Sequence, residues 1–290
     1  MRQKSWPLII TFALPGVLLY GLFVIYPVVS SLYMSLFQWR GMGAAKFIAI
    51  RNYVELFQDP DFWNAVINTL RFVAYQIPIM LGLALVFSLF ISLSQSRLAA
   101  FYRSLVFLPN ILPIVAVAAL WTAMLHPLTG AVNNLLTAVG LGEFAKPWLG
   151  QPSTAIGAIV WVDVWRMVGF YTVLLLSGIL NVPSEVIEAA RVDGATTGQI
   201  SVKVILHLLR GPLQVAAIFI MVNALKIFET PQLMTGGGPN RHTQPVSLYM
   251  YEQAFQNFSF GYAATIGVIF SILVFCITIV VLRLQGADKQ

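Results

Sequence analysis

The chain alternates long apolar stretches with short polar connections. Six of the apolar stretches are long enough to cross a hydrocarbon core of about 30 Å, because a helix rises about 1.5 Å per residue. Interior prolines such as Pro15, Pro27, Pro78 and Pro113 are compatible with membrane helices, since neighbouring helices can satisfy the freed backbone groups. The pattern predicts an all-α, polytopic membrane helix bundle of six transmembrane helices, near residues 8–37, 64–94, 103–126, 154–180, 213–231 and 261–283.

The polar connection at about residues 182–212 has the pattern of a short helix-turn-helix outside the membrane. Asn181 or Ser184 is positioned to cap its first helix. Gly194 supplies the left-handed residue that ends this helix. Thr196 and Gln199 have the spacing of a capping box, so a second helix is expected to start directly afterwards.

The first of these two short helices has a surface suited to close contact with a partner protein. Ala189 and Ala190 are small enough to let another surface approach, and Glu188 lies one turn from Arg191. An ordinary amphipathic loop would share this shape. The segment is nevertheless the longest polar interruption that still has a helical pattern.

The composition agrees with a membrane protein and disagrees with a soluble domain. Of the 290 residues, 58% are hydrophobic and 10% are charged, whereas about a quarter of the residues of a soluble domain are charged. The net charge of +6 has no basic stripe with interleaved aromatic residues, so nucleic acid is not an expected partner. No internal repeat or low-complexity segment divides the chain, which predicts one domain over residues 1–290.

The distribution of lysine and arginine predicts the orientation in the membrane. An N-terminus inside the cell places nine of these residues on cytoplasmic pieces and five on outer pieces, as the positive-inside rule requires. Both termini and the 182–212 loop are therefore expected to be cytoplasmic. The nine are Arg2, Lys4, Arg97, Arg103, Arg191, Lys203, Arg210, Arg283 and Lys289; the five are Arg40, Lys46, Arg51, Lys146 and Arg241.

The outer connections are rich in aromatic residues. Residues 38–63 contain Trp39, Trp63 and several other aromatic side chains, and residues 127–153 contain Trp148. Such residues commonly form an interfacial belt that contacts lipid. Docking of a protein partner outside the cell is the alternative interpretation.

No sequence pattern indicates catalysis or a metal site. His126, His207 and His242 lie on different connections and have no Cys, Asp or Glu at ligand spacing. No nucleophile elbow, zincin motif or Walker loop occurs, so an enzyme is not expected and no cofactor is assigned to this chain. Cys276 is the only cysteine and lies in an apolar run, which excludes a disulfide within the chain.

Ionisable residues within or beside the spans are the remaining candidates for function. Such residues are costly in lipid and normally face a bundle interior or a water-filled cavity. Asp163 and Arg166 are three residues apart and are expected to pair on one helix face. Asn223, Lys226 and Thr230 recur at helical spacing on the fifth stretch.

Two aromatic residues lie close to this group in the sequence. Trp165 and Phe170 offer flat surfaces that suit the C–H face of a sugar, whose hydroxyls need polar partners. A structural ion-pair network near the interface is the alternative interpretation of Arg166 and Lys226, while Arg71 and Glu229 are placed to snorkel toward the interface.

Two motifs carry a resemblance to a known family. Glu188-Ala189-Ala190, three residues and Gly194 resemble the cytoplasmic signature loop of permease subunits from binding-protein-dependent ABC importers. Leu233-Met234-Thr235-Gly236-Gly237-Gly238-Pro239 resembles the carbohydrate branch, especially its maltose-type first permease. The chain departs from the family by placing His207 where a proline is expected, which puts in question the kink where the loop returns to the membrane.

The resemblance implies that the chain lies in a bacterial inner membrane, and it also implies the partners and the mechanism. The chain would form a heterodimer with a second permease. A dimer of ATP-binding subunits and an extracytoplasmic solute-binding protein would complete the importer. Its substrate would be a carbohydrate, and lipid would surround the spans. ATP would be bound by the separate subunit. The coupling residues would be Glu188, Ala189, Ala190 and Gly194, and alternating access would move a midplane site from outward- to inward-facing.

The resemblance also implies a substrate pathway between the fourth and fifth spans. The charges at positions 163, 166 and 226 would suit a polar or acidic glycoside better than a neutral maltose-like one. Glycerol phosphate or another polar solute is an alternative, and so is a stand-alone ion-coupled transporter that uses Asp163 or Glu229 as proton carrier. One wall of the pathway would carry Asp163, Trp165, Arg166 and Phe170, and the facing wall Asn223 and Ile227 with Lys226 nearby.

Overall fold

The computed structural model describes residues 6–93 and 96–287. Three residues of the charge argument, Arg2, Lys4 and Lys289, lie outside this part of the chain, as does the side chain of Arg97. The chain forms two compact units. Unit 1 comprises the chain up to Trp63 together with Tyr249–Leu273, and unit 2 comprises Asn64–Leu248 together with the chain from Val274 onward.

The described residues contain the spans that the apolar pattern predicts. Four uninterrupted segments are long and apolar enough to cross a membrane: Thr11–Met34, Pro60–Leu93, Pro152–Leu180 and Phe260–Arg283. Two further pairs of helices pass the same test but are sharply bent, and each pair taken as one span gives up to six. This confirms the predicted all-α membrane fold, with two of its spans broken.

Unit 1 begins with the first span, which consists of three helical pieces. These are α1 (Trp6–Tyr20), the π-helix η1 (Gly21–Ile25) and α2 (Tyr26–Met34). The π-helix ends at Ile25, two residues before Pro27. The ring nitrogen of Pro27 cannot donate to the preceding turn, so a wider turn absorbs the mismatch. The most apolar part of this span is not buried within the chain, as expected where lipid or another subunit covers it.

The polar stretch after the first span is more ordered than a simple loop. A two-stranded antiparallel hairpin pairs β1 (Phe37–Gln38) with β2 (Lys46–Phe47), and α3 (Arg51–Gln58) follows. The buried Asn52 amide donates to the carbonyls of Ser35 and Phe37 at 2.8 and 3.1 Å, which fixes α3 against the hairpin. Neither the hairpin nor α3 was predicted from the hydrophobic pattern.

The remainder of unit 1 comes from the C-terminal part of the chain. It comprises the end of α14 (Val246–Tyr251), the π-helix η4 (Glu252–Gln256) and the first half of α15 (Phe260–Ala287). The carbonyl oxygen of Phe37 lies so close to Gly261 that a Cβ atom on this residue would clash with it. Only glycine permits this close approach between β1 and the start of α15.

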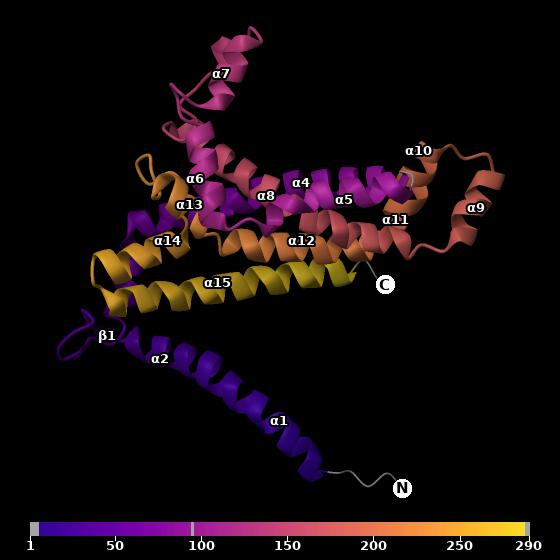
Figure 1. Ribbon diagram of the computed structural model, residues 1–290. Helices are drawn as coiled ribbons and strands as arrows, with labels where there is room; N and C mark the ends of the chain where they lie inside the picture. Colours follow the sequence, from indigo (N-terminus) through magenta and orange to yellow (C-terminus); the bar gives the residue numbers. More distant parts are fainter. Residues whose placement is uncertain (1–5, 94–95, 288–290) are drawn as a thin grey trace. The chain divides into compact units, whose positions relative to one another are not determined.

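Unit 2 contains a bundle in which the central helix is the most buried span. The long helices α4 (Pro60–Leu93, almost wholly in this unit), α5 (Ser96–Ile111), α8 (Pro152–Leu180) and α12 (Arg210–Leu225) run alongside one another (Figure 1). Ile159, Tyr171 and Leu175 of α8 are almost fully buried and pack with Phe72 and Ile220. The bundle therefore closes around α8.

Short elements occupy the two ends of this bundle (Figure 1). At one end lie α6, α7 and α13; at the other lie α9 and α10, followed by η3 and α11, which lead back to α12. The bounds are α6 (Ile114–Met124), α7 (Ala131–Ala138), η2 (Gly142–Phe144), α9 (Ser184–Val192), α10 (Thr197–Gln199), η3 (Ile200–Ile205), α11 (Leu206–Leu208) and α13 (Glu229–Thr235).

The third apolar stretch is not one straight helix. α5 and α6 meet at an angle of 95° between Ile111 and Ile114. Pro113 is the cause, because it disfavours helical geometry at Leu112 and cannot donate to the preceding turn. Pro113 is thus compatible with a span, as the sequence analysis held, but the span is bent at this point.

The fifth stretch ends earlier than its apolar composition predicts. α12 stops at Leu225, and α13 begins at Glu229 after a break of three residues. In a continuous helix, the Ile227 carbonyl would need an N–H from Pro231, which has none. The carbonyl accepts a hydrogen bond from the Ser247 hydroxyl instead. Thr230 is therefore not on the same helix as Asn223, contrary to the spacing argument.

Candidate functional site

A polar cavity of about 300 Å³ lies within unit 2, among the membrane spans. Its walls come from α4, α8, the end of α12 and the break that follows it. The break brings Lys226, Ile227, Glu229 and Thr230 to one side of the cavity. Non-helical backbone is tolerated at membrane depth where it is buried in protein or lines a cavity, and this break lines one.

Asp163 is the centre of the hydrogen-bond network in this cavity. Its Oδ2 accepts a hydrogen bond of 2.9 Å from the Gln76 amide, and its Oδ1 accepts one of 3.0 Å from the Thr230 hydroxyl. Arg166 Nη2 lies 3.7 Å from Oδ1, which confirms the pairing expected from the i,i+3 spacing. A carboxylate held by two donors and a cation is stabilised where a lone charge would be costly.

Arg166 retains donor capacity in the cavity. Its Nε is buried and makes no hydrogen bond with any residue in the described part of the chain. A guanidinium carries five N–H donors in a planar fork. The Arg166 side chain is 23% exposed, so an incoming oxygen acceptor can reach the guanidinium group from the cavity.

Asn223 and Tyr171 form the facing contact. The Asn223 amide donates a hydrogen bond of 3.0 Å to the Tyr171 hydroxyl. Tyr171 is almost fully buried, whereas Asn223 at the end of α12 is exposed toward the cavity. Asn223 thus combines an anchored side chain with an amide oxygen that has no partner among the hydrogen bonds of the described chain.

The structure brings five of the seven predicted pathway residues to this cavity. They are Asp163, Arg166, Asn223, Lys226 and Ile227. Trp165 faces another direction and packs its ring against Trp121, with ring centroids 5.5 Å apart. Phe170 lies edge-on to Tyr171 at 5.2 Å and is also absent from the cavity lining.

Two polar lining residues were missed in the sequence analysis. Gln76 lies in the middle of α4 among apolar residues, and a buried amide in a membrane span needs a partner. Tyr171 follows Asp163 by two turns, since residues 163, 167 and 171 share one face of α8. Extending the helical spacing from Asp163 by two turns would have predicted Tyr171 as a lining residue.

The four predicted coupling residues lie on α9 and the turn after it, in a helix-turn-helix. The Thr196 hydroxyl accepts from the Gln199 backbone N–H while the Gln199 side chain accepts from the Thr196 N–H, which confirms the capping box. Gly194 has a φ of +80° and ends the first helix, as predicted.

Two details of this loop differ from the sequence-based expectation. Neither Asn181 nor Ser184 caps α9: Pro183 occupies the cap position, and the Asn181 amide donates to the Ser177 carbonyl. The chain also keeps a bend of 68° between Thr197–Leu208 and Arg210–Leu225. The bend is therefore present although His207 stands where the family has a proline. Pro212 lies just after the bend, in the first turn of α12, where its missing N–H costs little.

The coupling loop has an anchored side and an open side. Ile187 and Ala190 of α9 pack on a small core formed by Ile179, Ile200 and Ile205. Glu188, Ala189 and Gly194 are exposed, and so is 87% of Val192. An apolar valine beside an acidic residue and a small residue on an open helix face is suited to protein contact.

The described chain contains no group of three metal-binding side chains. Its polar residues in the spans offer hydrogen-bond donors and acceptors to a passing solute.

Comparisons with known proteins agree with this architecture. Residues 80–287 match the model of the family "Binding-protein-dependent transport system inner membrane component". The chain is 33% identical to the diacetylchitobiose uptake system permease protein of Streptomyces coelicolor, over 93% of this chain and 81% of that protein. It is 32% identical to the lactose transport system permease protein of Rhizobium radiobacter, over 91% of this chain and 89% of that protein.

A solved structure shares the fold. The crystal structure of a bacterial ABC transporter involved in the import of the acidic polysaccharide alginate contains a chain that superposes with a TM-score of 0.86 at 23% identity. The match covers 98% of this chain and 96% of that chain. The family consists of membrane permease subunits and not of enzymes, which confirms that expectation. The chain belongs to the family of inner membrane components of binding-protein-dependent transport systems.

Proposed function

We propose that this chain is the permease subunit of an ATP-driven carbohydrate importer and that its solute passes the cavity around Asp163 and Asn223. The observation that carries this proposal is a cluster of polar side chains, including an unpaired Arg166 Nε, inside the helix bundle of a family member. Polar and ionisable groups among membrane spans are a standard sign of a solute pathway.

The class of substrate is supported by the relatives and by the cavity. Relatives at 32–33% identity are named for the uptake of diacetylchitobiose and lactose, both of which are oligosaccharides. The cavity holds the charged groups of Asp163, Arg166, Lys226 and Glu229 together with amide and hydroxyl groups. Such a wall suits a polar or acidic glycoside, because each hydroxyl or carboxylate of the solute finds a hydrogen-bond partner.

The coupling to ATP hydrolysis is assigned to the open face of α9. Glu188, Ala189 and Val192 are exposed there, while Ile187 and Ala190 tie the helix to the bundle. Movement of α9 by a partner would therefore be passed to Ile179 at the end of α8, the helix that carries Asp163. The partner proposed is a dimer of ATP-binding subunits, alongside a second permease and an extracytoplasmic solute-binding protein.

The orientation and the domain organisation follow the same proposal. Both termini and the α9 loop are placed in the cytoplasm, and the excess of lysine and arginine on these pieces supports that placement. Units 1 and 2 are taken to work as one permease domain over residues 1–290. The family match, which runs through both units from residue 80 to residue 287, supports this view.

The alternative of a stand-alone ion-coupled transporter finds little support in the cavity. Such a transporter needs a membrane carboxylate that exchanges protons during the cycle. Both oxygens of Asp163 instead have partners within the bundle, from Gln76, Thr230 and Arg166.

Purification of the chain from its native host tests the proposal. A tagged chain is expected to bring down a Walker-motif ATPase and a second permease, and ATP hydrolysis by this complex is expected to rise when the sugar-loaded binding protein is added. Isolation of the chain without any ATPase from mild detergent would contradict the proposal.

A further inference from the structure

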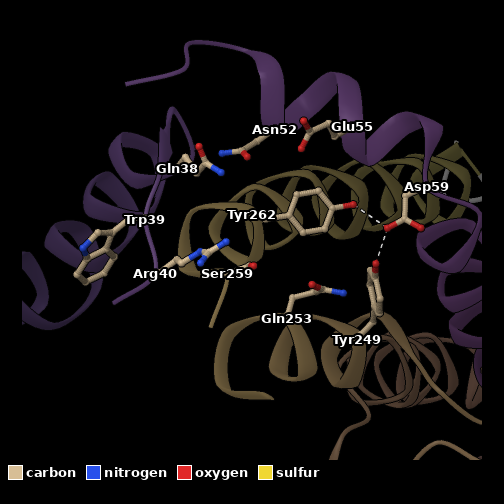
Figure 2. A pocket seen from close by; sticks show the side chains of 10 residues that line it. All are labelled: Gln38, Trp39, Arg40, Asn52, Glu55, Asp59, Tyr249, Gln253, Ser259 and Tyr262. Carbon is tan, nitrogen blue, oxygen red and sulfur yellow. Dashed lines mark hydrogen bonds between the residues drawn. The ribbon is translucent and has the colours of Figure 1, made fainter. Parts of the chain in front are cut away.

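Unit 1 contains a second polar cavity, of about 410 Å³, that is separate from the pathway residues (Figure 2). It is bounded by the residues that follow β1, by α3 with the start of α4, and by the segment from Tyr249 to Tyr262. Its volume is within the range of small-molecule sites, about 300–1,000 Å³. Its lining is polar, unlike that of a site for an apolar ligand.

Asp59 is the fixed point of this cavity. Its Oδ1 accepts a hydrogen bond of 2.9 Å from the Asp61 N–H, as an N-cap of α4 with Pro60 at the first helical position. Its Oδ2 accepts from the hydroxyls of Tyr262, at 2.7 Å, and Tyr249. These bonds hold the two tyrosine rings in place as walls of the cavity (Figure 2).

The ionisation of Asp59 agrees with this structural role. Burial raises the pKa of the carboxyl, but the two tyrosine hydroxyls and the Asp61 and Phe62 N–H groups together hold the pKa below its ordinary value. Asp59 is thus charged and its oxygens are occupied. Whatever binds in the cavity must be recognised by other side chains.

Several lining groups have free hydrogen-bonding capacity. Arg40 points into the cavity (Figure 2), and no described carboxylate lies within ion-pair distance of it. Asn52 uses its amide nitrogen on two carbonyls of the hairpin and keeps its oxygen free of these bonds. Glu55 pairs through one oxygen with Arg51, at 2.7 Å, and Gln253 accepts at its amide oxygen from Asn257 while its NH₂ remains a donor.

Donors and acceptors therefore face each other across the cavity. Figure 2 shows Asn52 and Glu55 along one side and Arg40 and Gln253 along the other, with the Tyr262 ring between them. The lining carries one cation, Arg40, and two carboxylates, Glu55 and Asp59, but the oxygens of Asp59 are occupied by their hydrogen bonds. One charge of each sign is therefore open to a ligand, which disfavours a simple anion or cation. Alternating donors and acceptors beside an aromatic ring match the hydroxyls and the C–H face of a sugar.

We propose that this cavity is a second carbohydrate-binding site, which takes a mono- or disaccharide through Arg40, Gln253, Glu55 and Asn52 before the sugar enters the spans. The inference rests on the proposed function in placing this end of α4 and α15 outside the cell. The site would raise the residence time of solute on the outer side of the permease.

Photolabelling of the purified complex tests the inference. The probes are diazirine derivatives of glucose, galactose, N-acetylglucosamine and glucuronate, and peptide mass spectrometry locates the label. At least one probe is expected to label residues 249–262, in competition with the parent sugar. The double variant Arg40→Ala, Gln253→Ala should lose this label by roughly tenfold or more, since each residue donates to a bound oxygen. Lys46→Ala, which removes an exposed cation of β2 outside the cavity lining, should retain it.

Three outcomes would overturn the inference: no labelling of residues 249–262 by any probe, equal labelling of the double variant, or loss of binding-protein stimulation in that variant without any sugar label. The last would make the cavity a docking point for a partner protein. Labelling needs no ATP and no transport, so its outcome can be read separately from the test of the proposed function. Failure of labelling with intact ATP-driven uptake rejects this inference alone, and labelling without ATP-driven uptake rejects the proposed function alone.

Discussion

The side-chain amide of Gln76 donates a hydrogen bond of 2.9 Å to Asp163 Oδ2 and thereby joins the middle of α4 to the middle of α8. Both residues are at a depth where an unpaired polar group would be costly. Together with Thr230 and Arg166, the Gln76 amide gives both oxygens of Asp163 a partner within the bundle. Solute recognition is then left to the Arg166 guanidinium and to Asn223, the groups without a full set of partners.

The first prediction concerns Asn223. Replacement by alanine removes a cavity amide and leaves the Tyr171 hydroxyl without its donor. A lost hydrogen bond of this kind costs about 1–3 kcal/mol, so uptake at low substrate concentration should fall by roughly 5- to 150-fold. Initial rates of labelled-sugar uptake into cells measure this effect.

Asn134→Ala is the matched control for Asn223→Ala. Asn134 is exposed on α7 and does not line the cavity. Its loss should leave uptake within twofold of the unmodified protein. Equal uptake by both variants, with the complex assembled, would mean that the solute passes elsewhere.

The second prediction separates packing from recognition at Trp165. Its ring packs on Trp121 and is not part of the cavity lining. Trp165→Ala should therefore lower the melting temperature of the complex, while uptake per folded complex stays close to that of the unmodified protein. Truncation of a fully buried aromatic residue costs about 3–5 kcal/mol, and the partly buried Trp165 should cost less. A normal melting temperature with abolished uptake would instead return Trp165 to the pathway.

The third prediction concerns the coupling loop. Glu188→Ala removes an exposed acidic group from α9, and loss of one partner of a docked charge pair costs about 2–5 kcal/mol. Gly194→Val forces a β-branched residue to a φ of +80°. Both changes should reduce co-purification of the ATPase and abolish transport. Gly198→Val is the control, because Gly198 has equal free space around it without a positive φ.

The fourth prediction concerns orientation. With Cys276 replaced by serine, a cysteine at Met42, which is 88% exposed, should react with an impermeant maleimide added to intact cells. A cysteine at Gly198 should react only after the cells are opened. The reverse pattern would place the α9 loop outside and separate it from any cytoplasmic ATPase.

The fifth prediction concerns Asp59 and acid. Because the folded state lowers its pKa, the ionised carboxylate stabilises the fold above the ordinary value of 3.8, and this stability is lost as the pH falls through the folded pKa. Asp59→Asn should lower the free energy of unfolding by about 1–2 kcal/mol at neutral pH. The difference from the unmodified protein should persist to pH 5 and disappear only below about pH 3.8. Glu55→Gln, at an exposed pair, should show a much smaller effect.

The membrane spans and the turns of the cytoplasmic loop could be predicted from the sequence, because they depend on apolar length and on local signals. The capping box at Thr196 and Gln199 and the left-handed turn at Gly194 follow from residue type and spacing alone. The broken spans could not be located in this way. Whether Pro113 or Pro78 interrupts a helix depends on the neighbours that replace the lost backbone bond, and both prolines lie in equally apolar surroundings.

The candidate site could be predicted only in part for a related reason. Asp163 and Arg166 stand out because charge is rare in a span, whereas Gln76 comes from a helix 87 residues away and meets Asp163 only through folding. Trp165 and Phe170 are adjacent to the cavity residues in sequence but point to other faces of α8. Proximity along a helix does not determine which side chains share a cavity.

Uptake into proteoliposomes tests the central claim most directly. Vesicles would contain the chain with its partner permease, either with or without the ATPase, and labelled sugar would be supplied on the binding protein. We expect accumulation only when the ATPase and internal ATP are both present, and a strong reduction in the Asn223→Ala complex. Accumulation of sugar by the permease alone under an imposed proton or sodium gradient, unaffected by ATP, would contradict the account.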